Sequence, residues 1–209
     1  MNLYQLAQID REITQKIRAK PLFVRVHSIP SNLSLEKEKW LVVDNVTSVF
    51  VDLTDSTSLA VGNKYDATSI LGYYARALIE IFEYYNSAYL DYQGDGGFSL
   101  FDGVDSVKKA IDCAITLNTL LNREKRLGIR IGIDVGTIYA KKVGKRGNNK
   151  ELWLGRPVSY SSKLCNLKND YLSPIRISRG VYYSLHQIYK QWCRPIDNDI
   201  YHSDMFWEF

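Results

Sequence analysis

The sequence has few of the residues on which disulfide-bonded and zinc-binding proteins depend. Of its 209 residues, only three are cysteines and three are histidines. They stand far apart, with no CxxC pair and no Cys/His spacing of the kind that binds zinc. This scarcity argues against a disulfide framework and a zinc site. It favours an intracellular protein with reduced thiols and structural histidines.

Long hydrophobic runs are also missing. No segment approaches the roughly 18 apolar residues of a membrane span, and the first 20 residues lack the apolar core of a signal peptide. We therefore expect a soluble, cytoplasmic protein with no membrane partner. The net charge of +4 is mild and suits a small polyanion such as a nucleoside triphosphate. It does not require nucleic acid, and no nucleic-acid partner is expected.

The remaining composition, 45% hydrophobic and 24% charged, is that of a globular domain with an extension. Apolar residues recur at helical spacing near the N-terminus and predict an amphipathic helix over 3–19. The stretch HSIPSNLSLEKEKW (27–40) has the composition of a linker. We expect residues 1–40 to form a helical arm and linker, and residues 41–209 to form the main domain.

Within that domain, strand and helix patterns alternate in a recognisable order. They predict a strand (44–54), a helix (66–86), a hairpin (91–101), a helix (107–127), two strands joined near 136, a helix (157–166) and a strand (173–178). This order predicts an α+β fold related to the ferredoxin-like βαββαβ arrangement, with a mainly antiparallel sheet and helices packed on one face.

The first strand ends in an unexpected carboxylate. Phe50 and Asp52 share one face of it, and a buried aspartate must be paired or bind a metal. The small polar residues that follow, LTDST (53–57), suit a phosphate cradle built from backbone N–H groups. They suit a helix N-cap equally well, and the segment alone does not decide between the two.

A second aspartate, Asp95, lies in the turn Gly94-Asp95-Gly96-Gly97. Taken alone, this cluster indicates only a hairpin turn. If the tip lies beside the end of the first strand, however, Asp95 meets Asp52. Two converging carboxylates, with the Leu53 carbonyl, waters and substrate phosphates, would hold Mg²⁺ or Mn²⁺.

Four stretches together resemble a known family. FVDLTDST, GDGGFSLF, IRIGIDVG and LGRPVSYSSKL occur in the order and spacing of the class III nucleotidyl cyclases, over about residues 44–179. Within that family the chain looks most like the pyrimidine-specific cyclases of bacterial Pycsar anti-phage defence. Those enzymes make cyclic UMP or cyclic CMP, which activates a separate effector protein. The resemblance makes residues 41–209 the expected catalytic domain.

The resemblance also implies a set of site residues. Asp52 and Asp95 would be the catalytic metal ligands for two Mn²⁺ or Mg²⁺ ions, with the carbonyl of Leu53. The triphosphate would lie on Leu53, Thr54, Asp55, Ser56 and Thr57, and Phe50 would border the base or sugar. The family forms a head-to-tail homodimer, in which one chain supplies the metals and the other supplies the helix after Gly155.

Two departures from the family pattern bear on the substrate. Asp91 stands where purine cyclases carry a base-reading Lys or Glu, and Leu152 stands where adenylate cyclases carry Asp or Thr. Asp91 could accept from the uracil N3–H or the cytosine N4 amine, or it could be a solvated edge residue. Trp153 and Tyr92 could fill the volume that a purine would occupy. UTP is the expected substrate and CTP the alternative.

The transition-state residues differ as well. Ser159 and Lys163 replace the family's Asn and Arg, and Arg156, Ser159 and Lys163 form one stripe of a helix. Such a stripe suits a triphosphate, although a solvated helix face remains open. The prediction is a uridylate cyclase. The alternatives are a cytidylate cyclase, an adenylate or guanylate cyclase, and a non-catalytic nucleotide-sensing module. The apolar C-terminus, DMFWEF, is expected to dock on the domain or on a partner.

Overall fold

The computed structural model describes residues 2–17, 20–33, 39–54, 64–125, 127–145, 148–167 and 172–208. In these residues a nine-stranded sheet has the order β3-β4-β2-β5-β7-β9-β8, with β1 paired to β2 and β6 paired to β5. The strands are β1 (Leu22–Val26), β2 (Lys39–Leu53), β3 (Tyr89–Gln93), β4 (Gly96–Phe101), β5 (Ile129–Lys145), β6 (Asn148–Leu154), β7 (Ile175–Ser178), β8 (Arg194–Pro195) and β9 (Ile200–Ser203). Most pairs are antiparallel, and β1·β2 and β5·β7 are parallel.

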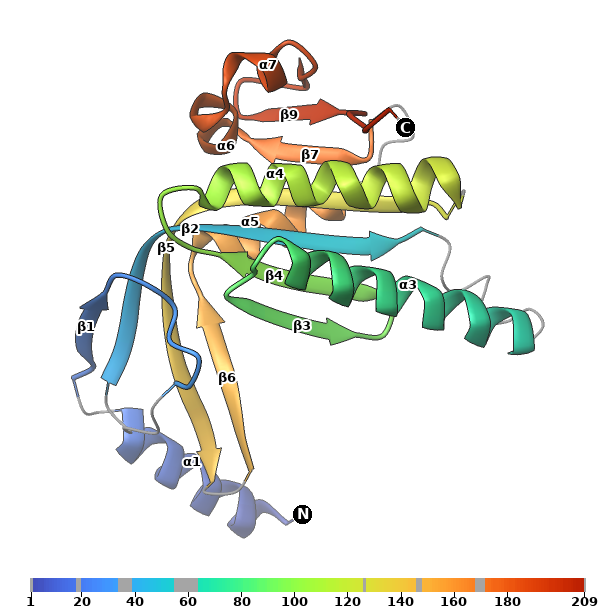
Figure 1. The fold of residues 1–209 in the computed structure, drawn as a ribbon. Coiled ribbons are helices and arrows are strands. Elements are labelled where there is room, and N and C mark those ends of the chain that lie inside the picture. Colours follow the sequence, from blue (N-terminus) through green and yellow to red (C-terminus); the bar gives the residue numbers. More distant parts are fainter. Residues whose placement is uncertain are drawn as a thin grey trace.

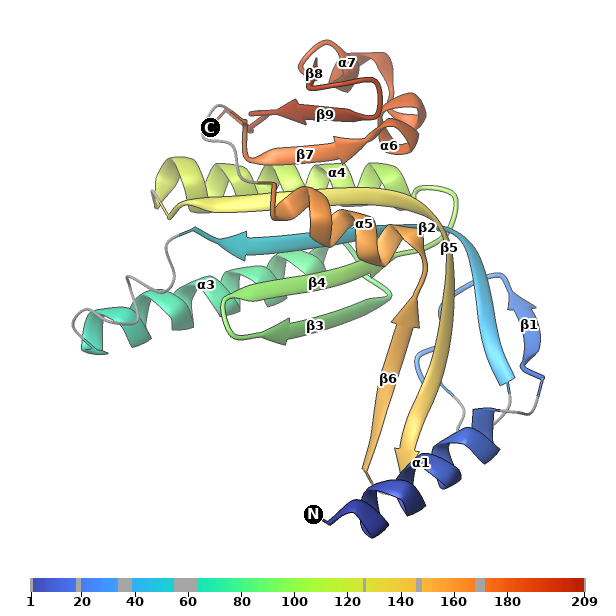
Figure 2. The ribbon, with the colours of Figure 1, turned by 180° about the vertical axis from the view of Figure 1, so that it is seen from behind.

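Helices cover both faces of this sheet. The described helices are α1 (Leu3–Ile17), α3 (Lys64–Tyr84), α4 (Ser106–Leu117), its π-helical continuation η1 (Asn118–Glu124), α5 (Arg156–Cys165), α6 (Arg179–Ser184) and α7 (Gln187–Lys190). Helices α3 and α4 lie on one face (Figure 1), and α5 lies on the other (Figure 2). The predicted α+β class with a mainly antiparallel sheet is confirmed, and α5 adds a helix on the second face.

Strand β2 is buried between these helical layers, and its alternate residues face opposite sides. The Thr47 hydroxyl donates to Ser106 at the start of α4, whereas the next residue, Ser48, shares a hydrogen bond of 2.8 Å with Ser161 of α5. Helix α5 approaches the sheet closely because β5 carries Gly132 there. A side chain at that position would collide with the backbone of Ser161. The alternation therefore fixes which residues of β2 lie under α5.

Two apolar clusters hold the layers together. The larger contains the inward residues of β2 and β5 and the inner sides of α3 and α4, including Val51, Leu78 and Ile131. The smaller lies on the α5 side and includes Leu100, Ile138 and Trp153. Burying each such side chain contributes roughly 1.5–3 kcal/mol. Both clusters contact β2, so the end of β2 has a rigid base.

The N-terminal region contains more structure than the sequence indicated. Helix α1 agrees with the predicted helix, but β1 was not predicted, and it pairs in parallel with the start of β2. Ile29 and Leu33, in the stretch expected to be a linker, are buried in the smaller cluster. The short strand LFVRV carries too little alternation to stand out from its surroundings. The boundary at residue 40 remains a prediction.

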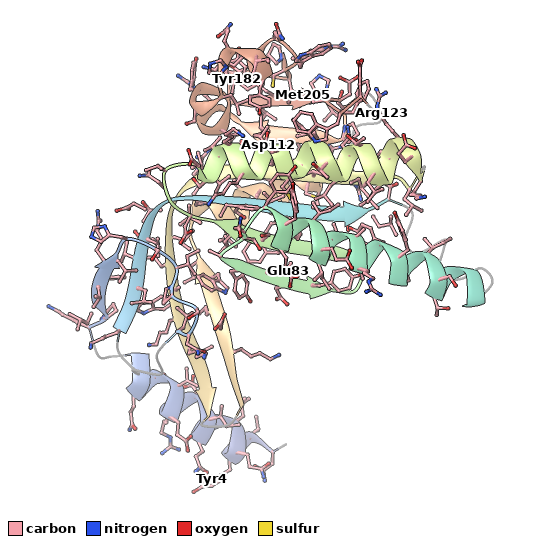
Figure 3. All side chains as sticks on the ribbon, in the orientation of Figure 1. Tyr4, Glu83, Asp112, Arg123, Tyr182 and Met205 are labelled. Atoms are coloured by element: carbon pink, nitrogen blue, oxygen red, sulfur yellow. The ribbon has the colours of Figure 1, made fainter. Side chains whose placement is uncertain are left out.

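The C-terminal residues dock on their own domain. The Asn118 side-chain amide donates to the Met205 carbonyl at 2.7 Å, and the Trp207 indole donates to Thr116 at 2.9 Å. The Arg123 guanidinium lies 3.0 Å from the centre of the Phe206 ring. In Figure 3, Met205 lies above the long helix that α4 and η1 form, and Arg123 lies nearer the C-terminal end of that helix. Among the described helices, none is long and apolar enough to cross a membrane.

Candidate active site

The two aspartates predicted to converge lie side by side. Asp52 pairs with Gly96 in the β2–β4 ladder, so the turn before Gly96 lies at the end of β2. The N–H of Leu53 donates to the Asp95 carbonyl at 3.2 Å. Gly94 has φ +64°, a left-handed conformation that favours glycine and lets the turn close tightly. The predicted meeting of the hairpin tip with the first strand is confirmed.

An arginine that the sequence analysis did not single out completes this cluster. Arg130 is the direct cross-strand partner of Asp52 on β5, and its Nη2 donates to Asp52 Oδ2 at 2.7 Å. Burial raises the pKa of Asp52, Arg130 opposes that rise, and the Asp95 carboxylate adds to it. The only sequence signal for Arg130 was a charge within the apolar strand IRIGI.

The aspartate pair has the chemistry of a magnesium or manganese site. The strand pairing brings the two carboxylates to the same end of β2, where Asp95 adds to the rise that burial causes in the pKa of Asp52, so the two negative charges repel each other. A divalent cation would relieve that repulsion. Within the described ranges no group of three or more His, Cys, Asp or Glu side chains could hold a metal. Further ligands would therefore be carbonyl, water or phosphate oxygens, which Mg²⁺ and Mn²⁺ prefer.

An aromatic floor extends from Asp52 across the same face of the sheet. Phe50 lies two residues before Asp52 and packs on Phe98 of β4, with ring centres 4.6 Å apart. Phe98 is in turn the cross-strand partner of Asp91 on β3. Direct partners in an antiparallel pair project to the same face. The structure thus places Phe50, Phe98 and Asp91 in one row beside Asp52.

The two bulky residues near Asp91 have different positions from those expected. Tyr92 follows Asp91 directly and faces the opposite side of the sheet, where it packs near Tyr74 of α3. It cannot fill space beside a base on the Asp91 side. Trp153 does lie on the Asp91 side, but it is buried against Tyr89 with ring centres 4.5 Å apart. Trp153 therefore supports the aromatic row from below, through Tyr89, which packs on Phe98.

The expected phosphate cradle is only partly described. The Leu53 side chain is buried in the larger cluster. Both donors of Thr54 are used within the chain: its N–H and its hydroxyl each donate to the Gly128 carbonyl, at 2.7 and 2.9 Å. Thr54 therefore anchors the start of β5. Asp55, Ser56 and Thr57 lie outside the described residues.

Helix α5 carries the predicted polar stripe on its exposed face. Its buried residues are Pro157, Ser161, Leu164 and Cys165. Arg156, Ser159 and Lys163 are exposed, and the Arg156 and Lys163 cations lie 4.7 and 5.8 Å from the Tyr160 ring centre. Because α5 buries its other side against β2 and β5, the exposed Ser159 and Lys163 face away from the sheet that carries Asp52. Within one chain, α5 does not direct these residues toward the aspartates.

Arg156 has a further contact that the sequence did not reveal. Its Nη1 lies 3.3 Å from Oδ1 of Asp134, a fully buried residue of β5. Burial raises the pKa of Asp134, and the Ser178 hydroxyl and Arg156 lower it. Asp134 thus holds the guanidinium of Arg156, the first residue of α5.

The fold is that of the class III nucleotidyl cyclases. The adenylyl cyclase CyaB from P. aeruginosa matches with a TM-score of 0.65 at 19% identity, over 78% of this chain and 95% of that one. A class III adenylyl cyclase-like ATP-binding protein from Pseudomonas aeruginosa matches with a TM-score of 0.69 at 19% identity, over 88% and 43%. A dimeric guanylyl cyclase domain from Blastocladiella emersonii matches with a TM-score of 0.63 at 18% identity, over 78% and 97%.

Relatives identified by sequence share one name, uridylate cyclase. A uridylate cyclase from Micromonospora echinofusca is 28% identical over 176 residues, and one from Propioniciclava tarda is 29% identical over 182 residues. Each match covers 76% of this chain, but only 57% and 58% of the relative. No family model matches the chain. The chain has the fold of class III cyclase domains and is related in sequence to proteins named uridylate cyclase.

Proposed function

We propose that this protein is a pyrimidine nucleotide cyclase that converts UTP to 3′,5′-cyclic UMP and pyrophosphate. The observation that carries the proposal is the meeting of Asp52 and Asp95 at the end of β2, beside the aromatic row of Phe50 and Phe98. A paired-carboxylate site next to an aromatic surface suits a nucleoside triphosphate. The relatives named uridylate cyclase support the choice of base.

Asp52 and Asp95 would hold two Mn²⁺ or Mg²⁺ ions, with the Leu53 carbonyl as a further oxygen. When bound, such ions neutralise the triphosphate and lower the pKa of the ribose 3′-hydroxyl. The 3′-oxygen attacks the α-phosphorus, the bond from that phosphorus to the bridging oxygen of pyrophosphate breaks, and the hydroxyl proton leaves to solvent. Arg130 adds a fixed positive charge beside Asp52, where negative charge accumulates on the leaving group. No protein nucleophile is needed.

The base would lie on the row formed by Phe50 and Phe98. Asp91, at the end of this row, would accept a hydrogen bond from the uracil N3–H. The same carboxylate could accept from the cytosine N4 amine, so CTP is the second candidate substrate. A purine reader at this position would ordinarily be a longer Lys or Glu, which this chain lacks.

The orientation of α5 favours a site shared between two chains. The exposed Ser159 and Lys163 face away from the aspartates of their own chain, in a direction that would let them approach those of a second copy. In a head-to-tail homodimer, Ser159 and Lys163 would contact the reacting phosphates of the partner's site. A guanylyl cyclase domain of similar fold, described as a non-canonical dimer, supports the pairing of two copies.

The biological role follows from the Pycsar resemblance alone. We propose that the cyclic nucleotide acts as a second messenger on a separate effector protein in anti-phage defence. This part of the proposal depends on the class of product, which a direct assay identifies.

The test is incubation of the purified protein with each of ATP, GTP, CTP and UTP in the presence of Mn²⁺, with products resolved by chromatography. Asp52→Asn protein serves as the control for contaminating activity. Cyclic UMP from UTP is the expected product. A purine product would overturn the assignment of the base. Tight nucleotide binding with no cyclic product would overturn catalysis, and would favour a nucleotide-binding module of the kind represented by the ATP-binding neighbour.

A further inference from the structure

The backbone immediately before Arg130 is held from two sides. On the β2 side, the Thr54 N–H and hydroxyl both donate to the Gly128 carbonyl. On the other side, Asn122 Oδ1 accepts from the Ile129 N–H at 2.7 Å, and Asn122 Nδ2 lies 3.4 Å from the Ile129 carbonyl oxygen. The side-chain amide of Asn122 thus binds both polar groups of Ile129.

This contact takes the place of a missing strand. Strand β7 is the neighbour of β5 on this side, but their pairing begins only at Ile131 with Ile175. Ile129 lies before that point, so β7 does not pair with it. Without Asn122, the N–H and carbonyl of Ile129 on this side of β5 would have no neighbouring strand to bond. Asn122 can reach it because η1, the π-helical end of the long helix, runs directly into the turn before β5. Single π-helical turns within longer helices often occur at functional sites.

Asn122 is itself anchored on a buried support. Its Nδ2 donates to Asn118 Oδ1 at 2.7 Å. Asn118 is buried, and its own Nδ2 donates to the Met205 carbonyl in the C-terminal tail, at 2.7 Å. A continuous set of hydrogen bonds therefore runs from the docked tail through Asn118 and Asn122 to Ile129, the residue that precedes Arg130.

We propose that Asn122 is a positioning residue that sets Arg130 against Asp52. The Arg130–Asp52 contact is short, at 2.7 Å, and depends on where β5 begins relative to β2. Displacing a charged group by about 1 Å in such a site can cost on the order of a hundredfold in rate. Asn122 holds the start of β5 without touching the substrate or either aspartate. This inference rests on the proposed cyclase function for its kinetic consequences, but its structural claim can be tested without activity.

The structural test observes Arg130 directly in protein free of metal and nucleotide. In ¹⁵N NMR spectra, a guanidinium held in an ion pair rotates slowly and its N–H groups resist exchange. The Arg130 signals are assigned by their absence in Arg130→Met. In Asn122→Ala, the Arg130 guanidinium should rotate faster and its N–H groups should exchange faster with water. Trp207→Ala, which breaks the Trp207–Thr116 bond on the same helix and leaves Asn122 in place, should retain them. Unchanged Arg130 signals in Asn122→Ala would overturn the proposal.

The kinetic test is a double-mutant cycle between Asn122→Ala and Arg130→Met. Loss of one positioning contact should lower kcat about fivefold to tenfold, and loss of Arg130 about a hundredfold. If Asn122 acts through Arg130, the double variant should match Arg130→Met within about twofold. Effects that multiply would indicate a general structural role and would overturn the inference. Trp207→Ala should change kcat less than about twofold.

A conservative variant keeps the test decisive if Asn122→Ala folds poorly. Asn122→Asp retains the oxygen that accepts from the Ile129 N–H and loses the donor to both Asn118 and the Ile129 carbonyl. It should keep more of the Arg130 protection and of kcat than the alanine variant does. Equal loss in both would contradict the role of the Ile129 contact. If wild-type protein makes no cyclic nucleotide while Asn122→Ala still releases Arg130, the proposed function fails and the positioning role stands.

Discussion

Asp52 and Arg130 are direct cross-strand partners on β2 and β5, and their side chains form an ion pair of 2.7 Å. Each side chain is only about a quarter exposed, 23% for Asp52 and 25% for Arg130. Water therefore screens this pair less than a surface salt bridge. Because burial raises the pKa of Asp52 and Arg130 opposes that rise, the arginine favours the ionised carboxylate that a metal ligand requires.

The first prediction concerns the aspartate pair. Asp52→Asn and Asp95→Asn should each lower turnover by about a thousandfold or more, because an amide oxygen carries no charge for a divalent cation. Cyclic nucleotide formation measures the first effect, and titration with Mn²⁺ in the absence of nucleotide measures the loss of metal binding. Asp105→Asn, at the exposed start of α4, is the matched control. Substantial turnover in either site variant would refute the assigned metal ligands.

The second prediction concerns the base. Asp91→Leu should lower kcat/KM for UTP by about tenfold to a hundredfold, since a hydrogen bond to a charged acceptor contributes about 1.5–3 kcal/mol. Its affinity for Mn²⁺ should be unchanged. The neighbouring Tyr92→Phe is a stringent control, because Tyr92 faces the α3 side of the sheet. If both variants behave like the wild type, Asp91 is a solvated edge residue and another group reads the base.

The opposite orientations of Asp91 and Tyr92 could be predicted from the sequence. Consecutive strand residues must face opposite sides, so alternation alone excludes Tyr92 from the Asp91 face. The meeting of Asp52 with Asp95 was also predictable, because hairpin and strand order constrain it. The Arg130 ion pair was not, since it depends on the register between β2 and β5 across 78 residues of sequence.

Contacts made by irregular backbone were beyond prediction for a related reason. The role of Thr54 in anchoring Gly128 depends on a loop geometry with no periodic signal. The reach of Asn122 to Ile129 depends on a π-helical turn, which a 3.6-residue pattern does not reveal. Strand β1 was missed because five residues at a sheet edge leave too short a pattern. The helix-and-strand order was predictable, and the side-chain contacts that refine the site were not.

The third prediction tests the shared site. Asp52→Asn and Lys163→Ala proteins should each be nearly inactive. Mixed, unfolded and refolded together, they should regain about a quarter of wild-type activity, because half of the dimers are mixed and each holds one intact site of two. The recovery is measured against each variant refolded alone. No recovery, in mixtures confirmed to contain mixed dimers, would mean that Lys163 serves the site of its own chain.

The last prediction concerns Asp134, the buried partner of Arg156. Its side chain is fully buried, and burial raises its pKa from the ordinary value of 3.8, against the opposing effects of Ser178 and Arg156. A carboxyl with a raised pKa in the folded state favours folding below the unfolded value and loses that contribution as the pH rises through its folded pKa. Wild-type protein therefore carries a cost at neutral pH that an uncharged amide avoids.

Asp134→Asn should accordingly gain stability relative to the wild type as the pH rises from about 4 to 7. The free energy of unfolding of the variant should rise relative to that of the wild type across this range, because only the wild type carries a buried charge at neutral pH. Urea unfolding at several pH values measures it, and Asp105→Asn controls for the loss of one carboxylate. The difference between the variant and the wild type is informative because all other titrations cancel. A difference that falls with rising pH would mean that the Arg156 ion pair outweighs burial, and that Asp134 stabilises the fold as a carboxylate.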